Sequence, residues 1–153
     1  MNRLLPFFIL LYILQMGCSE PRVLPVVSIK TTKDLDFDKK KAITFTQIGN
    51  MDTITLNGTA KWRGGWSRQF GKRSFTFDTE YPISLAGMNP HTKWILNASY
   101  IDKTLMRHRF WYDLWRSIDD EHQAADCRFV NLYVNGNNQG IYVAMERIHE
   151  SRL

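Results

Sequence analysis

Two apolar runs near the end of the chain, residues 129–134 and 140–148, flank the short polar segment NGNNQG. Asparagine and glycine accept the positive φ angles of a tight turn, so this pattern predicts a β-hairpin. An isolated hairpin is marginally stable in water. The rest of the chain must therefore supply strands or a helix that cover it.

Earlier segments carry the alternation or the β-branched residues of strands. They are residues 23–29, 43–48, 53–63, 73–79 and 93–99. Pro25 interrupts the first of them, which indicates an edge strand or the start of a strand. The sequence therefore predicts a largely antiparallel sheet.

One segment, YIDKTLMRHRFWYDLWRSID, predicts a helix, with Asp102 at the N-cap and no helix breaker for about 15 residues. Its apolar positions recur at helical spacing, and we expect this stripe to pack in the core. The stripe comprises Met106, Phe110, Leu114 and Ile118, widened by Trp111 and Trp115. Strands followed by one principal amphipathic helix and a hairpin indicate a single domain of the α+β class.

The first 17 residues predict an export signal. Arg3 precedes an apolar run from Leu4 to Leu14, which is shorter than the roughly 20 residues that a membrane-spanning helix needs. The alternative is a buried N-terminal strand or helix. The segment LQMGC resembles the lipobox of bacterial lipoproteins, which implies lipid on Cys18, a mature chain 18–153 and an exported protein anchored at the membrane of the cell envelope. The other cysteine, Cys127, is predicted to be a small buried hydrophobe.

The net charge of +5 and the pI of about 9.3 fit an anionic partner, such as a nucleotide, a nucleic acid or a lipid headgroup. Positive charge gathers in RGGWSRQFGKRSFTFDT, residues 63–79, where two glycines precede a strand-like run. This stretch is open to two interpretations, a solvated hairpin or a cradle for phosphate groups.

Three segments in order resemble the CotH-like kinase family. They are RGGWSRQFGKRSF, WILNASYIDKTLMRH and FVNLYVNGNNQGIYVAMERI. The resemblance is to the N-terminal half of that family. It implies a fold like the N-lobe of an atypical protein kinase, and a domain that uses ATP and Mg²⁺ to phosphorylate protein Ser or Thr.

The resemblance also implies a nucleotide site. Lys72 matches the family's nucleotide-phosphate lysine, and glycine allows the backbone to approach a phosphate closely. Arg107 either reaches a phosphate or pairs with Glu146, whereas Asp102 is expected to serve as a helix cap. The implied nucleotide-binding set is Arg63, Gly64, Gly65, Ser67, Lys72, Arg107 and Glu146. The chain departs from the family pattern at Gly71, which replaces a proline, and at Gly65 and Trp66, which replace an Asn-Ser pair.

The family's catalytic and metal-binding aspartates lie beyond the hairpin, so no catalytic or metal-binding residue is assigned and the chain is expected to be a truncated member, inactive alone. The alternative is a noncatalytic exported lipoprotein module that binds a protein or a glycan. Exposed aromatic residues would serve that role, although most of the five tryptophans are expected in the core. Stacking on single-stranded nucleic acid is a third interpretation, which export disfavours.

Overall fold

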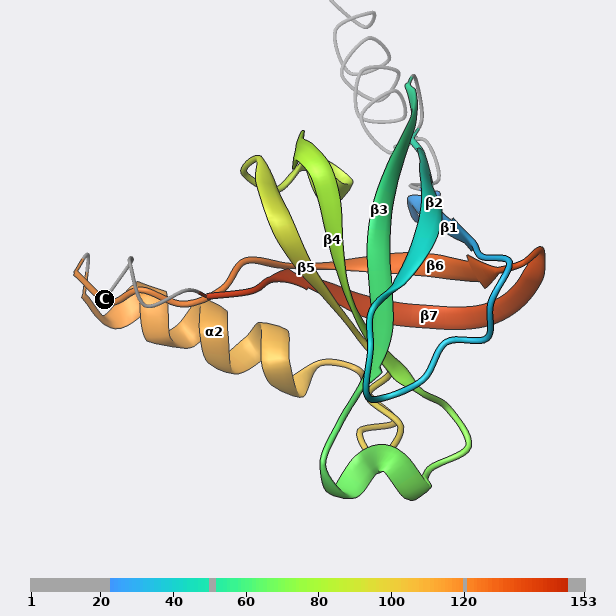
Figure 1. Cartoon of the computed structure of the whole chain (residues 1–153). Helices are drawn as coiled ribbons and strands as arrows, with labels where there is room; N and C mark the ends of the chain where they lie inside the picture. The colour runs from blue at the N-terminus through green and yellow to red at the C-terminus, as the bar shows by residue number, and fades with distance from the viewer. Residues whose placement is uncertain (1–22, 50–51, 120, 149–153) are drawn as a thin grey trace, which may run out of the picture.

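The computed structural model describes residues 23–49, 52–119 and 121–148. Seven strands form a closed barrel in the order β1-β2-β3-β4-β5-β7-β6 (Figure 1). Their bounds are β1 (Val26–Lys30), β2 (Lys41–Ile48), β3 (Thr53–Arg63), β4 (Ser74–Ile83), β5 (His91–Asn97), β6 (Cys127–Val134) and β7 (Asn137–Glu146).

The barrel closes through a pairing between strands that are far apart in the sequence. β1 runs parallel to β6, with Val26 opposite Asn131 and Ile29 opposite Val134. The other neighbouring strands pair antiparallel. Closure gives each of these seven strands a partner on both sides, which reduces the exposed edge available for edge-to-edge association.

Alternate residues of each strand fill the barrel interior. The rings of Phe45 and Phe77 stack with their centroids 5.0 Å apart. Trp94 and Tyr142 are fully buried, and each donates its polar hydrogen to a backbone carbonyl, Trp94 to His91 at 2.9 Å and Tyr142 to Arg73 at 2.8 Å. Large aromatic side chains therefore enter the core without leaving an unpaired donor.

Two local predictions are confirmed, the turn of the β6–β7 hairpin and the strand start at Pro25. The β6–β7 hairpin turns at Asn135 and Gly136, whose φ angles are +49° and +82°, as a two-residue turn of this composition requires. Pro25 directly precedes β1, so it marks a strand start. Gly58 lets β3 approach β4 closely, because a Cβ there would lie 2.3 Å from the carbonyl oxygen of Asp78.

The predicted α+β fold, like the N-lobe of a kinase, is wrong. The chain is mostly β, and α2 (Arg107–Ile118) is the one α-helix of the described residues, beside the short 3-10 turns η1 (Trp66–Gln69) and η2 (Leu85–Gly87). The strand segments were recognised, but the β1–β6 pairing that closes them joins residues about 100 positions apart. No local pattern specifies such a pairing.

The start of α2 also differs from the prediction, which placed Asp102 at the N-cap. The N-cap is four residues later, at Met106, and the helix begins at Arg107. Asp102 nevertheless accepts the backbone N–H of Arg107 at 3.0 Å and the hydroxyl of Thr104 at 2.7 Å. Asp102 therefore caps the helix, as expected, but does so from a turn that precedes it.

The apolar stripe of α2 does not pack in the core, contrary to the prediction. Trp111 is 61% exposed and Ile118 is 63% exposed, and no residue of the helix is fully buried. The half-buried side of α2 carries His108, Arg109, Tyr112 and Arg116 instead. The helix lies beside the barrel, near the Glu146 end of β7 (Figure 1).

Cys127 is buried as predicted, in a small apolar cluster with Ala125, Val143 and Met145 on the outside of the barrel. Burial, and then the neighbouring Asp126, raises the pKa of its thiol to about 12. The predicted signal segment and Cys18 lie outside the described residues. Within the described part, no helix has the length and apolar character to cross a membrane.

Replacing Phe77 by alanine should lower the free energy of unfolding by about 3–5 kcal/mol, because a buried ring leaves a cavity. Phe110→Ala on the exposed side of α2 should change it by no more than about 0.5 kcal/mol. Urea denaturation of dilute protein measures both. A large loss for Phe110→Ala would show that α2 does pack by its apolar side.

Candidate functional site

A cleft runs along the outside of the barrel, between α2, the loop 64–73 and the outer faces of β3, β4, β5 and β7. We call it the α2 cleft. It consists of three adjoining pockets of about 430, 250 and 290 Å³. Arg63 and Tyr112 line the first two pockets, and Ser67 and His108 line the last two, so the three adjoin one another along this side of the barrel.

Six of the seven predicted nucleotide-binding residues line this cleft. They are Arg63, Gly64, Ser67, Lys72, Arg107 and Glu146. They are spread along its length: Glu146 shares the 430 Å³ pocket with Arg63, whereas Lys72 and Arg107 share the 290 Å³ pocket. Gly65 lines none of the three.

Lys72 is held by strand β7. Its ammonium group donates a hydrogen bond to the carbonyl of Ile141 at 2.6 Å and lies 4.3 Å from the centroid of the Tyr142 ring. Burial, and then the charge of Lys103, lowers the pKa of Lys72. An ammonium has three donors, so this geometry leaves two of them for a ligand.

Positive charge is crowded at the other end of the cleft. Lys61, Arg63 and Arg147 line the 430 Å³ pocket. Burial, and then the nearby charge of Arg147, lowers the pKa of Arg63. Within the described residues, none of Lys61, Arg63, Lys72 and Arg147 makes an ion pair. An anion entering the cleft would relieve this repulsion.

The glycine pair has two different environments. Gly64 has φ +137°, and a Cβ on it would lie 2.2 Å from the hydroxyl oxygen of Ser67. Gly64 also accepts a hydrogen bond from the side chain of Arg68 at 2.7 Å, which directs that guanidinium over the ring of Phe37. Gly64 is thus required by the turn itself, whereas a Cβ on Gly65 would meet open space.

A polar cluster forms the floor between Lys72 and Arg63. The hydroxyl of Ser74 donates to Asn97 at 3.3 Å and accepts the backbone N–H of Ala98 at 3.0 Å. The side-chain amide of Asn97 lies 3.3 Å from the ring of His108. These groups tie β4 and β5 to the first turn of α2.

Ser99 stands out in this region. It is 8% exposed, its φ angle is +44°, and its hydroxyl oxygen is buried with no hydrogen-bond partner among the described residues. A serine in left-handed backbone and an unpaired buried hydroxyl both cost free energy. Both features occur at a residue that lines the pocket of Lys72.

Arg107 pairs with Asp102 rather than with Glu146, at 3.7 Å between Nε and Oδ1. Its side chain is 72% exposed. The hydroxyl of Thr104, and then the backbone N–H of Arg107, keep the pKa of Asp102 below its usual range. Asp102 therefore stays charged and holds the turn before α2, which leaves the guanidinium of Arg107 accessible from the cleft.

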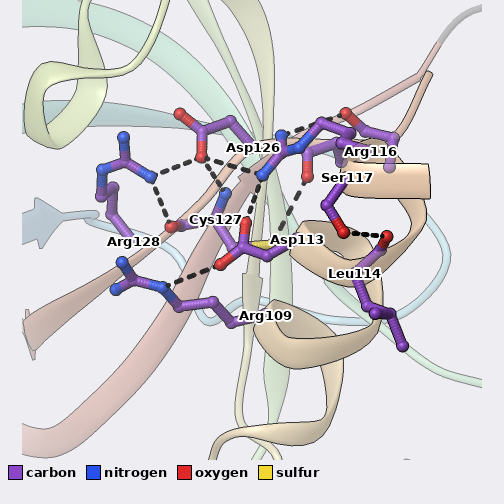
Figure 2. A network of polar contacts seen from close by, with 10 residues as sticks. Arg109, Asp113, Leu114, Arg116, Ser117, Asp126, Cys127 and Arg128 are labelled. Atoms are coloured by element: carbon purple, nitrogen blue, oxygen red, sulfur yellow. Dashed lines mark hydrogen bonds and ion pairs between the residues drawn. The ribbon is translucent and has the colours of Figure 1, made fainter. Parts of the chain in front are cut away.

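An ionic network fixes α2 as one wall of the cleft (Figure 2). Arg109 and Arg116 of α2 both pair with Asp113, and Arg116 also lies 3.8 Å from Asp126, which pairs with Arg128 of β6. Tyr112 packs beside this network against the apolar cluster around Cys127. In the described part of the chain, no three His, Cys, Asp or Glu side chains gather in a way that would hold a metal ion.

The sequence analysis missed several lining residues, chiefly Lys61, Asn97 and Arg147. Lys61 was detectable, since it lies two positions before Arg63 in one strand and strand side chains alternate between faces. The position of Arg147 depends on the pairing of β7 with β5, which no short-range pattern indicates.

The geometry defines a small β-barrel with a positively charged cleft beside its helix. A model of the CotH kinase protein family matches residues 60–153, more than half of the chain, and the chain belongs to this family. The match contains all seven predicted nucleotide-binding residues. The chain is also similar to the inner spore coat protein H of Bacillus subtilis (strain 168), with 30% identity over 89 residues. The aligned part is 58% of this chain and 23% of that relative, so the chain spans about a quarter of the relative's length.

Replacing Ser99 by alanine should raise the free energy of unfolding by about 1 kcal/mol, because it removes an unpaired buried hydroxyl. Ser74→Ala is the matched control and should lower it by a similar amount, since the Ser74 hydroxyl makes two hydrogen bonds. Chemical denaturation measures both variants. Equal losses for the two would mean that the Ser99 hydroxyl has a partner.

Proposed function

We propose that this chain is the nucleotide-binding part of a CotH kinase domain, and that the α2 cleft binds the phosphates of ATP with Mg²⁺. The observation that carries the proposal is the row of cations in the cleft, Lys61, Arg63, Arg147 and Lys72, none of which pairs with an acid of the described residues. Burial lowers the pKa of both Arg63 and Lys72, and so do the nearby charges of Arg147 on Arg63 and of Lys103 on Lys72. Phosphate groups would reverse that effect.

The chemistry of phosphoryl transfer supports this assignment. Transfer relies on positioning and on cations around the phosphates more than on covalent chemistry by the protein. We assign Lys72 and Arg107 to one end of the triphosphate, with Ser67 between them and Arg63. Transfer to protein Ser or Thr is proposed for a whole domain of this family. For this chain, which spans 23% of its relative, we propose binding alone.

We also propose where the protein is located. The relative's name places that protein in the inner spore coat. We propose that this chain is likewise exported, with a lipid on Cys18 that holds it at a membrane of the cell envelope.

A second candidate function is a noncatalytic module that binds a protein or a glycan. The exposure of three tryptophans favours it: Trp66 is 83% exposed, Trp111 is 61% exposed and Trp115 is 48% exposed. Only Trp94, and in part Trp62, pack in the core. The two functions differ in how ligand binding depends on the positive charge of the cleft, because stacking on a neutral sugar needs no cation.

Titration calorimetry with ATP and Mg²⁺ tests the nucleotide assignment. Lys72→Met removes the charge but keeps an aliphatic stem over Tyr142, and it should weaken binding about ten-fold or more, because a hydrogen bond to a charged group is lost. Raising the salt concentration should weaken binding of the wild-type chain as well.

Lys30→Met on β1 is the matched control, since Lys30 is exposed and lines none of the three pockets. It should bind ATP as the wild-type chain does. A folded wild-type chain that does not bind ATP, or binding that Lys72→Met leaves unchanged, would contradict the assignment.

A further inference from the structure

Helix α2 turns its polar side to the barrel and its apolar side to solvent. We call the apolar side the outer face of α2. It comprises Met106, Phe110, Trp111, Leu114, Trp115 and Ile118, each between 38% and 63% exposed. On the opposite side, Arg116 lies 3.8 Å from Asp126, outside the helix (Figure 2). Tyr112 packs there against the cluster around Cys127. The helix therefore cannot bury its outer face by rolling over without breaking these contacts.

The six large apolar side chains form one patch. Five of them lie on α2, and Met106 is its N-cap. Soluble monomers scatter single apolar residues over their surface, whereas a contiguous patch of this kind marks an interaction site. Two neighbouring residues, Tyr100 and Ile101, are 42% and 65% exposed and lie just before the helix.

The charges at the two ends of α2 indicate what covers this face. Lys103 and Arg107 lie at its N-terminal end, and Asp119 and Glu121 lie at its C-terminal end. Asp102 and Arg116 have the signs that the dipole of the helix favours, but Asp102 is buried as the cap and Arg116 is half-buried in the ionic network. The charges that stay exposed are therefore basic at the N-terminal end and acidic at the C-terminal end.

An antiparallel copy of the same helix would meet them with opposite charges. Arg107 and Asp119 are each six residues from Asp113, so a two-fold axis that crosses the outer face at this level, beside Leu114, places each Arg107 opposite the partner's Asp119. The same axis places Trp111 opposite the partner's Trp115. Arg107 and Asp119 are 12 residues apart, which corresponds to about 18 Å along a helix. The two helix dipoles are then also antiparallel, and every favourable contact occurs twice.

We propose that the outer face of α2 is the contact surface of a symmetric dimer, in which the α2 helices of two copies pack antiparallel. An anionic lipid surface fits less well, because the acidic end of the helix would be repelled by it. One helix face is smaller than the roughly 800 Å² per partner of a standard interface. The dimer should therefore be weak and its population should depend on concentration. This inference does not rest on nucleotide binding.

Sedimentation velocity of the full chain over a concentration series tests the dimer. Leu114→Glu puts two like charges beside the two-fold axis and should make the chain monomeric at concentrations at which the wild-type chain is dimeric. Trp66→Glu is the matched control, since Trp66 is more exposed than the large apolar residues of α2 but lies on η1. It should leave the dimer unchanged. Far-UV circular dichroism confirms that both variants fold.

A charge exchange tests the antiparallel arrangement. Arg107→Glu and Asp119→Arg should each weaken dimerisation by roughly ten-fold, because each reverses two surface ion pairs of the dimer. The double variant should restore it. This rescue is specific to an antiparallel copy, since no other partner supplies both substituted residues.

Three outcomes would overturn the proposal. One is a wild-type chain that stays monomeric across the series, and another is a dimer that Leu114→Glu leaves intact. The third is a double variant no better than its parents. Vesicles of phosphatidylcholine with phosphatidylserine serve as the probe for the lipid alternative: a monomeric chain that floats with them, and loses this in Leu114→Glu, would assign the outer face to a membrane surface.

Discussion

The parallel pairing of β1 with β6 is the interaction on which the rest of the structure depends. It turns a sheet of seven strands into a barrel, and its register carries through to the cleft. Val26 of β1 pairs with Asn131 of β6, Asn131 pairs with Ile141 of β7, and the carbonyl of Ile141 holds the ammonium of Lys72. A slip of one residue in the closing pair would turn alternate side chains of β1 to the wrong face and would take Val27 and Ile29 out of the core.

The ionic network of α2 helps to determine which side of the helix packs against the barrel. Each of its surface ion pairs contributes little alone. They act together with Tyr112, which packs on the cluster around Cys127. The result is a helix whose charged side is half-buried and whose aromatic side is exposed, the reverse of an ordinary surface helix.

The closing strand pair and the orientation of α2 explain which parts of the structure could be predicted from the sequence and which could not. The strands and the β6–β7 hairpin were predicted because alternation and the Asn-Gly turn are local signals. The barrel was not, because its closing pair joins distant residues. The spacing of Phe110, Leu114 and Ile118 correctly indicated an amphipathic helix. Periodicity does not say which side meets the protein when the other side carries Arg116, which lies near Asp126, and Tyr112, which packs on the cluster around Cys127. Six of the seven predicted nucleotide-binding residues line one cleft; whether they bind nucleotide stays a prediction. Arg147 also lines the cleft and was missed, because only strand pairing brings it near Arg63.

Helix α2 also joins the two proposed sites. His108 and Tyr112 on its inner side wall the cleft, and Phe110, Trp111 and Leu114 on the same turns form the outer face. A contact that orders the outer face restricts the motion of this wall, and a ligand in the cleft restricts it from the other side. If both favour one position of α2, thermodynamic linkage requires that each strengthen the other by the same factor. Because one helix of 12 residues carries both surfaces on opposite sides, a change in what covers its outer face would reach the cleft through α2 itself.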